Sequence, residues 1–414
     1  MNTKYIHIGK STILWEKTSF SRAFKFLKNN SLSRAELSDD NGNVKNIHYG
    51  DILIKFSECL YADEGNNIPY IINDNIAYKL LKLSPLINGD IVFADAAEDN
   101  TVGKCIEIIT HNDTDLVAGL HTIPCRPTIK FAEGYLGYYL NSTAFHNQLL
   151  QYIQGTKISS ISKKSICQTI ISYPSEIINQ QKIASYFQSL DSLIQSTSKK
   201  LVSLKQVKAA SLQSMFPQEG ETVPKVRFKG FEEEWKKEKL GNLFKERIEN
   251  NINGELLSVT INNGIIKASD NGRFDNSNND KSHYKVVKIG DIVYNTMRMW
   301  QGSSGYSAYE GIVSPAYTVI IPQEQVFPLF FAYLFKTQSL INRFRIHSQG
   351  LTTDTWNLKF TGFSIIEVCF PKSKLEQQKI ASYFCNLDKQ ISLQTQHLEK
   401  LKQIKAACLD KMFV

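Results

Sequence analysis

Hydrophobic residues recur at helical spacing through two long stretches of the chain. From Ile183 the apolar positions step by four, three, four, seven and three residues, and from Ile380 they repeat the same steps. This spacing predicts two long helices with a coiled-coil seam. The seam residues are Ile183, Phe187, Leu190, Ile194, Leu201 and Leu204 in the first helix and Ile380, Phe384, Leu387, Ile391, Leu398 and Leu401 in the second. We expect the two apolar stripes to pack together; the alternative is that each helix packs on the globular domain beside it.

The two stretches are copies of one another. Gln180–Phe216 aligns without a gap with Gln377–Phe413, 197 residues later, with 21 identities in 37 positions. Both copies open with Gln-Gln-Lys-Ile-Ala-Ser-Tyr-Phe and end with Met-Phe. The segments between the copies are much less alike, so the chain alternates two divergent inserts with two conserved helices, as a tandem duplication does when its framework is retained.

Local signals mark where the helices begin. Pro174 and Pro371 stand just before them, where the first amides have no intrahelical partner. Ser373, with Glu376 three residues later, fits a capping box. The first helix is predicted over about residues 176–214, which at 1.5 Å per residue makes it on the order of 55 Å long.

The inserts contain three Gly-Asp-Ile sequences, which open the segments Gly50–Ile54, Gly89–Phe93 and Gly290–Tyr294. Each is followed by apolar residues of the kind found in buried strands. We interpret the motif as a turn into a strand, in which Gly supplies an unusual φ and Asp accepts hydrogen bonds from backbone amides. A catalytic Asp is the alternative interpretation.

The remaining pattern of the inserts predicts a mixed α+β fold. Amphipathic helices are expected near residues 134–151 and 328–347. Trp15 and Trp235, each near the start of an insert, are expected to anchor the cores. The fold class is therefore two globular mixed α/β domains and two long helices that form an antiparallel coiled coil, with a pseudo-two-fold internal repeat.

Composition excludes several classes of protein. With 414 residues, 42% of them hydrophobic and 21% charged, the chain is long enough for two or three globular domains. It contains no run of about 18 apolar residues and no apolar leader, so neither a membrane span nor a signal peptide is expected, and we expect a cytoplasmic protein. The seven cysteines form no Cys-x-x-Cys pair and are expected to be free thiols.

The net charge of +8 and the pI near 8.9 suit a polyanionic partner. Within the inserts, cations collect beside side chains that can form paired hydrogen bonds with base edges, which favours DNA binding. For any single one of these residues a solvated surface position is the competing interpretation. The candidate DNA-binding residues are Lys104, Arg126, Gln154, Lys157, Ser159, Lys163, Lys285, Arg298, Trp300, Gln301, Arg343, Arg345 and Gln349.

Motifs for intrinsic catalysis are incomplete, so we expect no catalytic and no metal-binding residues. Ser314–Tyr317 resembles the Asp/Asn-Pro-Pro-Tyr loop of amino-methyltransferases but lacks its second proline. Val102–Cys105 lacks the upstream Gly and the hydroxyl of a P-loop. An acidic group at residues 90–99 is a weak candidate for a nuclease metal site and has no repeated counterpart.

The alternation of inserts and helices, the Gln-Gln-Lys-Ile-Ala helix start, the Gly-Asp-Ile-Val strand and Gly155–Ser159 together resemble the specificity subunit of type I restriction–modification systems. The resemblance covers essentially the whole chain. It implies that each insert is a target recognition domain reading one half of a bipartite, asymmetric site in double-stranded DNA. It also implies that the helices pair antiparallel, set the spacer between half-sites and dock methyltransferase subunits, with two of these expected.

The resemblance also implies how the chain is divided. Recognition domains are expected over 1–165 and 235–362, conserved helices over 174–216 and 371–414, and a linker over 217–234. The linker carries the lead-in Pro224–Phe231, of which an N-terminal copy is missing or reduced to Met1–Leu14. That difference leaves the start of the first domain open.

Chemistry would then belong to partners. S-adenosylmethionine, ATP and Mg are expected on the methyltransferase and the restriction/translocase subunits, with no cofactor on this chain. The alternatives are a specificity subunit of a related methyltransferase or nuclease assembly outside type I, a DNA methyltransferase or nuclease in its own right, and a coiled-coil adaptor that never touches DNA.

Overall fold

The computed structural model describes the chain except for residues 1–3, 9–10, 64–66, 113, 156, 262–263, 272–279, 354 and 414. Thr156, within the segment that contributes to the family resemblance, therefore lies outside the described residues. The chain divides into two compact units: Met1–Ser198 together with His397–Val414, and Lys199–Gln396. Each unit contains one insert and parts of both long helices.

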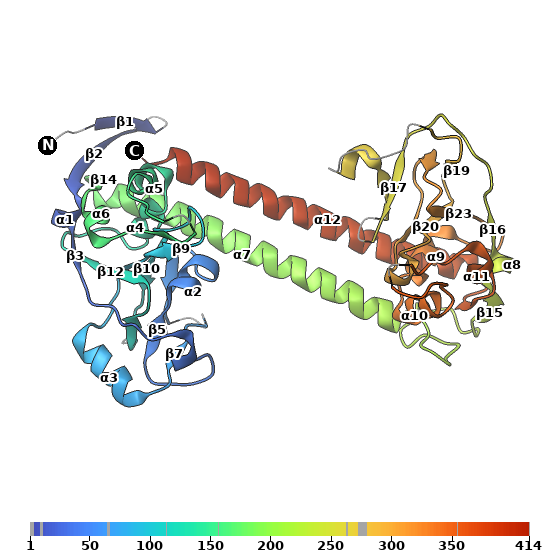
Figure 1. Cartoon of the computed structure of the whole chain (residues 1–414), viewed down its shortest axis with the longest axis horizontal. Helices are drawn as coiled ribbons and strands as arrows, with labels where there is room; N and C mark the ends of the chain where they lie inside the picture. Colours follow the sequence, from blue (N-terminus) through green and yellow to red (C-terminus); the bar gives the residue numbers. More distant parts are fainter. Residues whose placement is uncertain are drawn as a thin grey trace. The chain divides into compact units, whose positions relative to one another are not determined.

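The two predicted long helices are confirmed as α7 (Ile177–Ser214) and α12 (Lys374–Lys411) (Figure 1). In the first unit, Phe187 of α7 stacks on Phe413 just beyond α12, with ring centroids 5.8 Å apart. In the second unit, Phe384 of α12 stacks on Phe216 just beyond α7, at 5.7 Å. Within each unit the start of one helix thus meets the end of the other, so the pairing is antiparallel, and the repeated Met-Phe ending supplies the partner ring.

The seam residues have the burial that their spacing predicts. Nine of the twelve seam side chains are buried, and Ile194, Leu204 and Ile391 are partly exposed. Five of the buried members join the apolar core of their own unit: Ile183 and Phe187 in the first, and Ile380, Phe384 and Leu387 in the second. Each helix therefore packs on its neighbouring globular domain as well as on the other helix. The two arrangements that the sequence analysis treated as alternatives are both present.

The first glutamine of the repeated motif holds each helix start to its insert. Gln180 accepts a hydrogen bond from the amide of Ala132 (2.9 Å) and donates to the carbonyl of Pro174 (2.8 Å). Gln377 likewise accepts from the amide of Phe327 (2.7 Å) and donates to the carbonyl of Pro371 (2.9 Å). Both side chains are buried, so these bonds satisfy polar groups that would otherwise lack partners.

The capping box predicted at Ser373 and Glu376 forms only in part. Ser373 Oγ accepts a hydrogen bond from the amide of Glu376 at 3.4 Å. The Glu376 carboxylate instead makes two hydrogen bonds with Arg227 (2.7 and 2.9 Å) and accepts one from Trp235 Nε1 (3.3 Å). A partly buried cation offers the carboxylate a stronger, charge-assisted pairing than one backbone amide does.

The first unit is built on a five-stranded sheet in the order β3-β12-β8-β10-β6. Its strands are β3 (Phe24–Phe26), β12 (Thr122–Pro127), β8 (Ile91–Ala94), β10 (Cys105–Ile109) and β6 (Cys59–Tyr61). A four-stranded sheet contains β11 (Leu116–Ala118), β5 (Lys45–Ile47), β7 (Tyr70–Ile71) and β4 (Leu37–Ser38). A three-stranded sheet has β2 (Ser11–Ser19) between β1 (Lys4–Ile8) and β14 (Ile170–Pro174), and β9 (Ala96–Ala97) pairs with β13 (Ser159–Ser160).

The helices of the first unit cover this framework. They are α1 (Phe20–Ala23), η1 (Arg34–Glu36), α2 (Tyr49–Ile54), α3 (Asp74–Leu83), α4 (Tyr135–Leu140), α5 (Thr143–Leu150) and α6 (Lys163–Cys167). Helix α4 packs on β10 (Figure 1). All six of its residues are buried.

The second unit repeats the central sheet with four strands in the order β16-β23-β20-β21. These strands are β16 (Phe244–Glu246), β23 (Tyr317–Pro322), β20 (Ile292–Asn295) and β21 (Ser304–Tyr306). Two-stranded pairings are β15 (Lys236–Lys239) with β24 (Glu367–Phe370), β17 (Leu257–Thr260) with β18 (Gly264–Lys267), and β19 (Lys285–Val287) with β22 (Gly311–Val313). Its short helices are α8 (Leu240–Leu243), η2 (Ala268–Asn271), η3 (Met299–Gln301), α9 (Pro328–Leu334), α10 (Gln338–Ile346) and α11 (Phe360–Ser364).

The Gly-Asp-Ile turn is confirmed at two of its three occurrences. Gly89 and Gly290 have φ of 81° and 97°. Asp90 accepts from the amide of Ile87, and Asp291 from that of Lys288, both at 2.8 Å. Strands β8 and β20 follow and are buried.

The strand expected at Gly50–Ile54 is wrong, because these residues form helix α2. The His48 ring accepts a hydrogen bond from the amide of Gly50 and so caps the helix. Asp51, in the first helical turn, pairs with Arg34 and with Lys55 one turn later. These contacts favour a helix, and Ile54 at its end is 86% exposed, so the apolar run was not a buried strand.

Each single amphipathic helix expected near 134–151 and 328–347 is in fact two short helices. Ser142 Oγ donates to the carbonyl of Tyr139 (2.6 Å), and Thr337 Oγ1 donates to that of Leu334 (2.8 Å). Hydroxyl groups that bond back to a carbonyl in this way compete with helix continuation.

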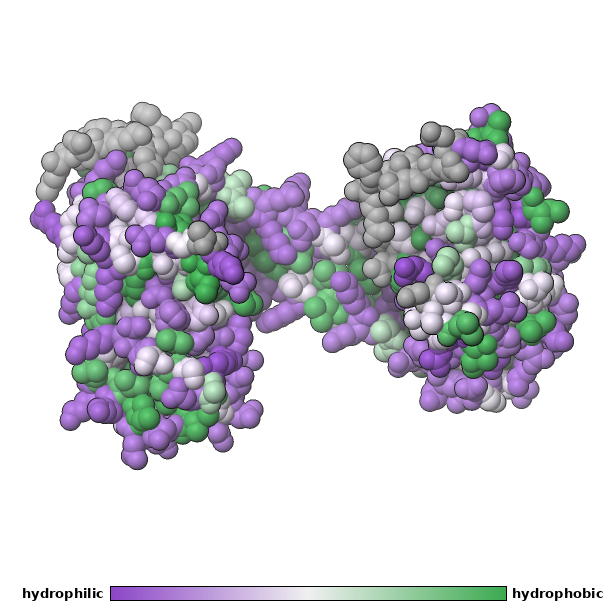
Figure 2. Space-filling view, viewed as in Figure 1, coloured by the Kyte–Doolittle hydropathy of each residue, from purple (hydrophilic) through white to green (hydrophobic). Residues whose placement is uncertain are grey.

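The core expectations for the tryptophans are confirmed. Trp15 is 1% exposed and Trp235 is 3% exposed, and each belongs to the main core cluster of its unit. Figure 2 shows a mainly hydrophilic surface with small scattered hydrophobic areas on the visible face. No helix among the described residues is long and apolar enough to cross a membrane. All seven cysteines are free thiols.

Candidate nucleic-acid interface

In each unit, two loops from distant parts of the insert lie side by side at equivalent places. In the first unit the amide of Ile161 donates to the carbonyl of Asp95 at 2.9 Å, and in the second the amide of Leu358 donates to that of Thr296 at 2.8 Å. We name residues 95–97 with 154–155 and 157–161 the first loop pair, and residues 295–301 with 349–353 and 355–358 the second loop pair. One member of each pair follows the Gly-Asp-Ile strand, and the other follows the two short helices.

A repeated Gln-Gly step turns the chain into each of these loops. Gly155 has φ of 109° and Gly350 has φ of 145°, a region that L side chains rarely adopt. A Cβ on Gly155 would lie 1.9 Å from the carbonyl oxygen of Ile158, and one on Gly350 would lie 2.6 Å from that of Thr355. Glycine is therefore required at both positions, which explains why this short echo persists between inserts that otherwise diverge.

The second loop pair gathers four of the candidate residues: Arg298, Trp300, Gln301 and Gln349. The Arg298 side chain is exposed and donates to Gln301 Oε1 at 3.3 Å. Trp300 donates from Nε1 to the carbonyl of Met297 and meets Trp356 edge-on, with centroids 5.2 Å apart. The partly exposed Trp356 was missed by the sequence analysis, because it lies in no repeated register.

The first loop pair gathers Gln154, Lys157 and Ser159. Gln154 and Lys157 are exposed, and Ser159 belongs to β13, which pairs with β9. Beside them the Asp95 carboxylate lies 3.1 Å from Nδ1 of His121, whose φ of 52° is unusual for a residue other than glycine. This surface therefore offers a cation, amide and hydroxyl groups, and a carboxylate held by an imidazole.

The structure places the six other candidates away from the loop pairs or against protein partners. Lys104 donates to the carbonyls of Leu53 (3.2 Å) and Phe56 (3.0 Å) at the end of α2, and desolvation lowers its pKa. Lys163 lies over the ring of Phe26, with its nitrogen 5.6 Å from the centroid.

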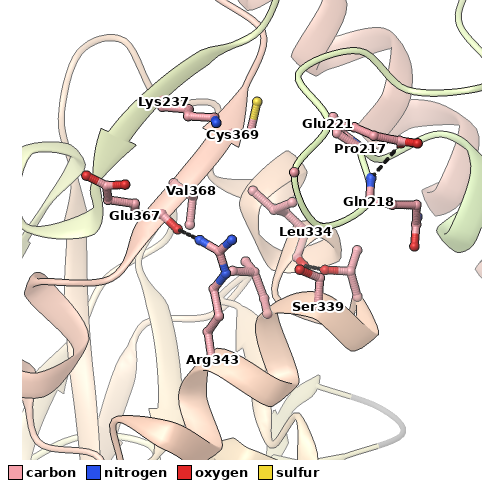
Figure 3. A pocket seen from close by; sticks show the side chains of 13 residues that line it. Pro217, Gln218, Glu221, Lys237, Leu334, Ser339, Arg343, Glu367, Val368 and Cys369 are labelled. Atoms are coloured by element: carbon pink, nitrogen blue, oxygen red, sulfur yellow. Dashed lines mark hydrogen bonds between the residues drawn. The ribbon is translucent and has the colours of Figure 1, made fainter.

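In the second unit, Lys285 pairs with Glu246 at 3.4 Å. Arg343 donates to the carbonyl of Glu367 at 2.7 Å in a cavity of about 90 Å³, where Figure 3 shows its guanidinium pointing at that oxygen. Arg345 is exposed on α10. A DNA contact by any of these residues stays a prediction.

Arg126, the sixth residue placed elsewhere, pairs with the aspartate of the Gly-Asp-Ile turn. Its guanidinium makes two hydrogen bonds with the buried Asp90 carboxylate (2.7 and 2.8 Å) and a third with the carbonyl of Pro85. Arg247 makes the same two-bond contact with Asp291, at 2.9 Å for both. The hydrogen bonds that the two guanidinium groups donate to Asp90 and Asp291 raise the pKa of both arginines. The two aspartates thus have structural partners in place of the catalytic role considered above.

A second repeated ion-pair network joins each insert to the helices. In the first unit, Asp191 of α7 accepts from the hydroxyl of Tyr138 (2.8 Å) and pairs with Lys405 of α12 (2.6 Å). In the second, Asp388 accepts from Tyr333 (2.9 Å) and pairs with Lys208 (2.5 Å). The sequence showed these aspartates and lysines as repeats but gave no sign that they form pairs.

Catalytic groupings are not evident among the described residues. No group of three or more His, Cys, Asp or Glu residues there could hold a metal ion. Three of the four acidic residues considered for a nuclease site have separate partners: Asp90 binds Arg126, Asp95 binds His121, and Asp99 accepts from Thr101.

Comparison with known proteins gives the family. The profile of the type I restriction modification DNA specificity domain matches residues 41–206 and 232–403. Among solved structures, the S subunit of a type I restriction–modification system from M. genitalium aligns with a TM-score of 0.58 and 14% identity, over 99% of this chain and 98% of that one. A structure concerning complex assembly and conformational transition of the type I R-M system gives 0.51 and 15%, over 96% and 97%.

A search of curated protein sequences finds no significant match. The two structural likenesses are below 25% identity and show the fold. The profile covers well over half of the chain, in two segments that each contain most or all of one insert and much of one conserved helix. The protein therefore belongs to the family of type I restriction–modification DNA specificity subunits.

Proposed function

We propose that this chain is the DNA-reading subunit of a type I restriction–modification complex, in which each insert is a recognition domain for one half of a bipartite, asymmetric site. The observation that carries the proposal is the equivalent placement of the two loop pairs. Both stand on the same framework of a Gly-Asp-Ile strand, two short helices and a Gln-Gly turn, yet their exposed side chains differ. A shared scaffold with different reading groups is what two different half-sites require.

Each loop pair contains the groups needed for direct readout. Arg298, Gln301 and Gln154 have side chains that can make paired hydrogen bonds to base edges in the major groove. Lys157 can neutralise a phosphate. These assignments concern chemical capacity, and the identity of the bases follows from none of them.

The chain supplies sequence choice to other subunits and carries no chemistry of its own. Methyltransferase subunits, two in number, dock on the paired helices, and a restriction/translocase subunit joins through the complex. S-adenosylmethionine, ATP and Mg belong to those partners. Support comes from the incomplete methyltransferase and P-loop motifs in the sequence and from the solved complex-assembly structure of a type I system.

Exchanging residues 15–160 for the corresponding insert of a relative is expected to change one half-site and leave the other intact. Contacts made by separate domains act nearly independently, and a wrong base pair costs roughly 1–3 kcal/mol. The measurement is mapping of methylated adenines after reconstitution with the methyltransferase subunit, with this chain alone as the control reaction. Loss of both half-sites in a folded chimera would contradict modular reading, and methyl transfer by the chain alone would contradict the non-catalytic role.

Lengthening both helices is expected to change the spacer without changing either half-site. One heptad added after Ile194 and one after Ile391 keeps the apolar seam in phase and adds about 10 Å of helix. At about 3.4 Å per base pair this corresponds to roughly three more unread pairs. Methylome mapping decides the matter, because an active variant that retains the original spacer would show that helix length does not set it.

A further inference from the structure

A lysine that is mostly buried ties together three backbone segments beside the second loop pair. Lys336 follows α9, and its ammonium donates to the carbonyls of Ile261 (3.2 Å), Ser304 (2.8 Å) and Gly302. The three acceptors belong to the residue after β17, to β21 and to the residue that ends η3. An ammonium has three N–H donors, so each is used, and this offsets part of the cost of removing the charge from water.

The first unit has a simpler residue at the equivalent position. Asn141 follows α4, three residues after Tyr138, as Lys336 follows Tyr333. The Asn141 side chain exchanges hydrogen bonds with both backbone groups of Cys105, at 3.1 and 2.8 Å. Both residues thus secure the equivalent strand, β10 or β21. The lysine also reaches Gly302 and Ile261, which the shorter amide could not.

These extra contacts bear on the candidate reading residues. Gly302, with φ of 81°, closes η3 by donating from its amide to the carbonyl of Met299. Trp300 and Gln301 belong to η3, and Arg298 is its N-cap residue. A cation that fixes the last carbonyl of this single turn restrains the backbone from which these side chains project.

We propose that Lys336 is a positioning residue for DNA recognition: it holds η3 and the end of β17 so that Arg298 and Gln301 are presented in one fixed arrangement. The inference rests on the proposed function and adds a residue that touches no DNA. It also makes the two domains unequal, because an ionisable group restrains the loop in the second domain and a neutral amide takes its place in the first.

The ionisation of Lys336 gives this asymmetry a measurable consequence. Burial, together with the charge of Lys208, lowers its pKa to about 8, and the charge of Asp388 opposes this shift. Above that pH the neutral amine has two N–H groups for three carbonyls. The preference for particular bases in the second half-site should therefore weaken as pH rises through about 8, while the preference in the first half-site stays unchanged.

The effect on unfolding runs the other way. The pKa of Lys336 in the folded state lies below its value in the unfolded chain. Titration of this group therefore adds to the free energy of unfolding as pH rises from about 8 to 10.5. A drop in half-site discrimination without a drop in melting temperature is thus a sign that a merely structural role would not give.

The test uses the complete complex with its methyltransferase subunit and a double-stranded DNA library with randomised positions. Bound sequences are compared for the wild type, Lys336→Met and the control Lys237→Met, which removes an exposed lysine of the same unit. For Lys336→Met, preference at base pairs of the second half-site should fall about tenfold, with the first half-site unaltered. The control should match the wild type.

The outcomes separate the two proposals. A wild-type complex that selects no bipartite motif contradicts the proposed function itself. A bipartite motif that is identical in wild type and Lys336→Met overturns only the role of Lys336, as does equal weakening of both halves. If Lys336→Met does not assemble, wild-type selection at pH 7 and pH 9 still decides, because unchanged second-half preference at the higher pH overturns the inference.

Discussion

Replacing Arg126 by methionine is expected to lower the free energy of unfolding of the first unit by about 3–5 kcal/mol, the range for breaking a buried ion pair from one side. The Asp90 side chain is fully buried and depends on Arg126 for two of its hydrogen bonds. Methionine would leave that carboxylate charged and unpaired beneath the turn into β8. Urea denaturation of the full chain, followed by tyrosine and tryptophan fluorescence, measures the change.

The matched control is Arg22→Met, which removes an exposed arginine from α1 of the same unit and should change stability by no more than about 0.5 kcal/mol. Combining Arg126→Met with Asp90→Asn should cost less than the sum of the two single changes, because the second removes the charge that the first left unpaired. A stable Arg126→Met variant with weakened DNA binding would instead support the sequence interpretation of Arg126 as a DNA contact.

Arg126 illustrates what the sequence could not reveal. An arginine in a divergent, basic insert has the right chemistry for phosphate or guanine. Its pairing with Asp90 depends on β12 lying next to β8, which is a long-range event. In the second unit the equivalent aspartate is paired by Arg247, which follows β16 on the other side of β23. The arginine that binds the aspartate therefore comes from a different strand in each copy. An alignment of the two copies does not place Arg126 opposite Arg247.

The helices were predictable because their signals are local and occur twice. The seam spacing, the proline before each helix and the repeated Gln-Gln-Lys-Ile-Ala start all depend on residues close in sequence. The misassigned segment at Gly50–Ile54 shows the opposite case. Five residues with three apolar side chains fit a strand or a short helix equally well, and the choice came from His48 and Lys55, outside the segment that was read.

The thirteen candidates were chosen for their chemistry, and the sequence could not indicate which of them share a surface. Seven of the thirteen candidates, four in the second loop pair and three in the first, lie where two distant loops meet. Flanking sequence could not separate these from candidates such as Lys104, whose ammonium binds backbone carbonyls. A basic or amide side chain can contact DNA only where the fold leaves it without a better partner. Trp356 and Lys336 stand out only through contacts with residues more than 30 positions away in the chain.

The helix-to-insert networks provide the second large effect. Replacing Lys405 by methionine is expected to destabilise the first unit by about 3 kcal/mol. Its ammonium lies between two carboxylates, 2.5 Å from Glu58 and 2.6 Å from Asp191, and all three side chains are largely buried. Burial alone would lower the pKa of Lys405, yet the two carboxylates raise it above its usual value. Methionine would leave two negative charges facing each other.

The pH dependence of that loss has a definite sign. With the cation gone, repulsion raises the pKa of one of the two carboxyl groups in the folded variant. A carboxyl whose folded pKa is raised contributes stability at low pH that is lost as pH rises through that value. The gap between wild type and Lys405→Met should therefore be larger at pH 8 than at pH 5 in urea denaturation.

The repeat supplies graded controls for Lys405→Met within the same chain. Lys208→Met in the second unit removes a cation from one carboxylate, Asp388, whose side chain is 40% exposed, so its effect should be intermediate, at about 1 kcal/mol. Lys402→Met removes a 54% exposed lysine paired with Glu399 three residues away, and its effect should be close to zero. The expected order of destabilisation is Lys405, then Lys208, then Lys402. Equal losses at Lys405 and Lys402 would show that helix charge, and not the network with Glu58 and Asp191, stabilises this junction.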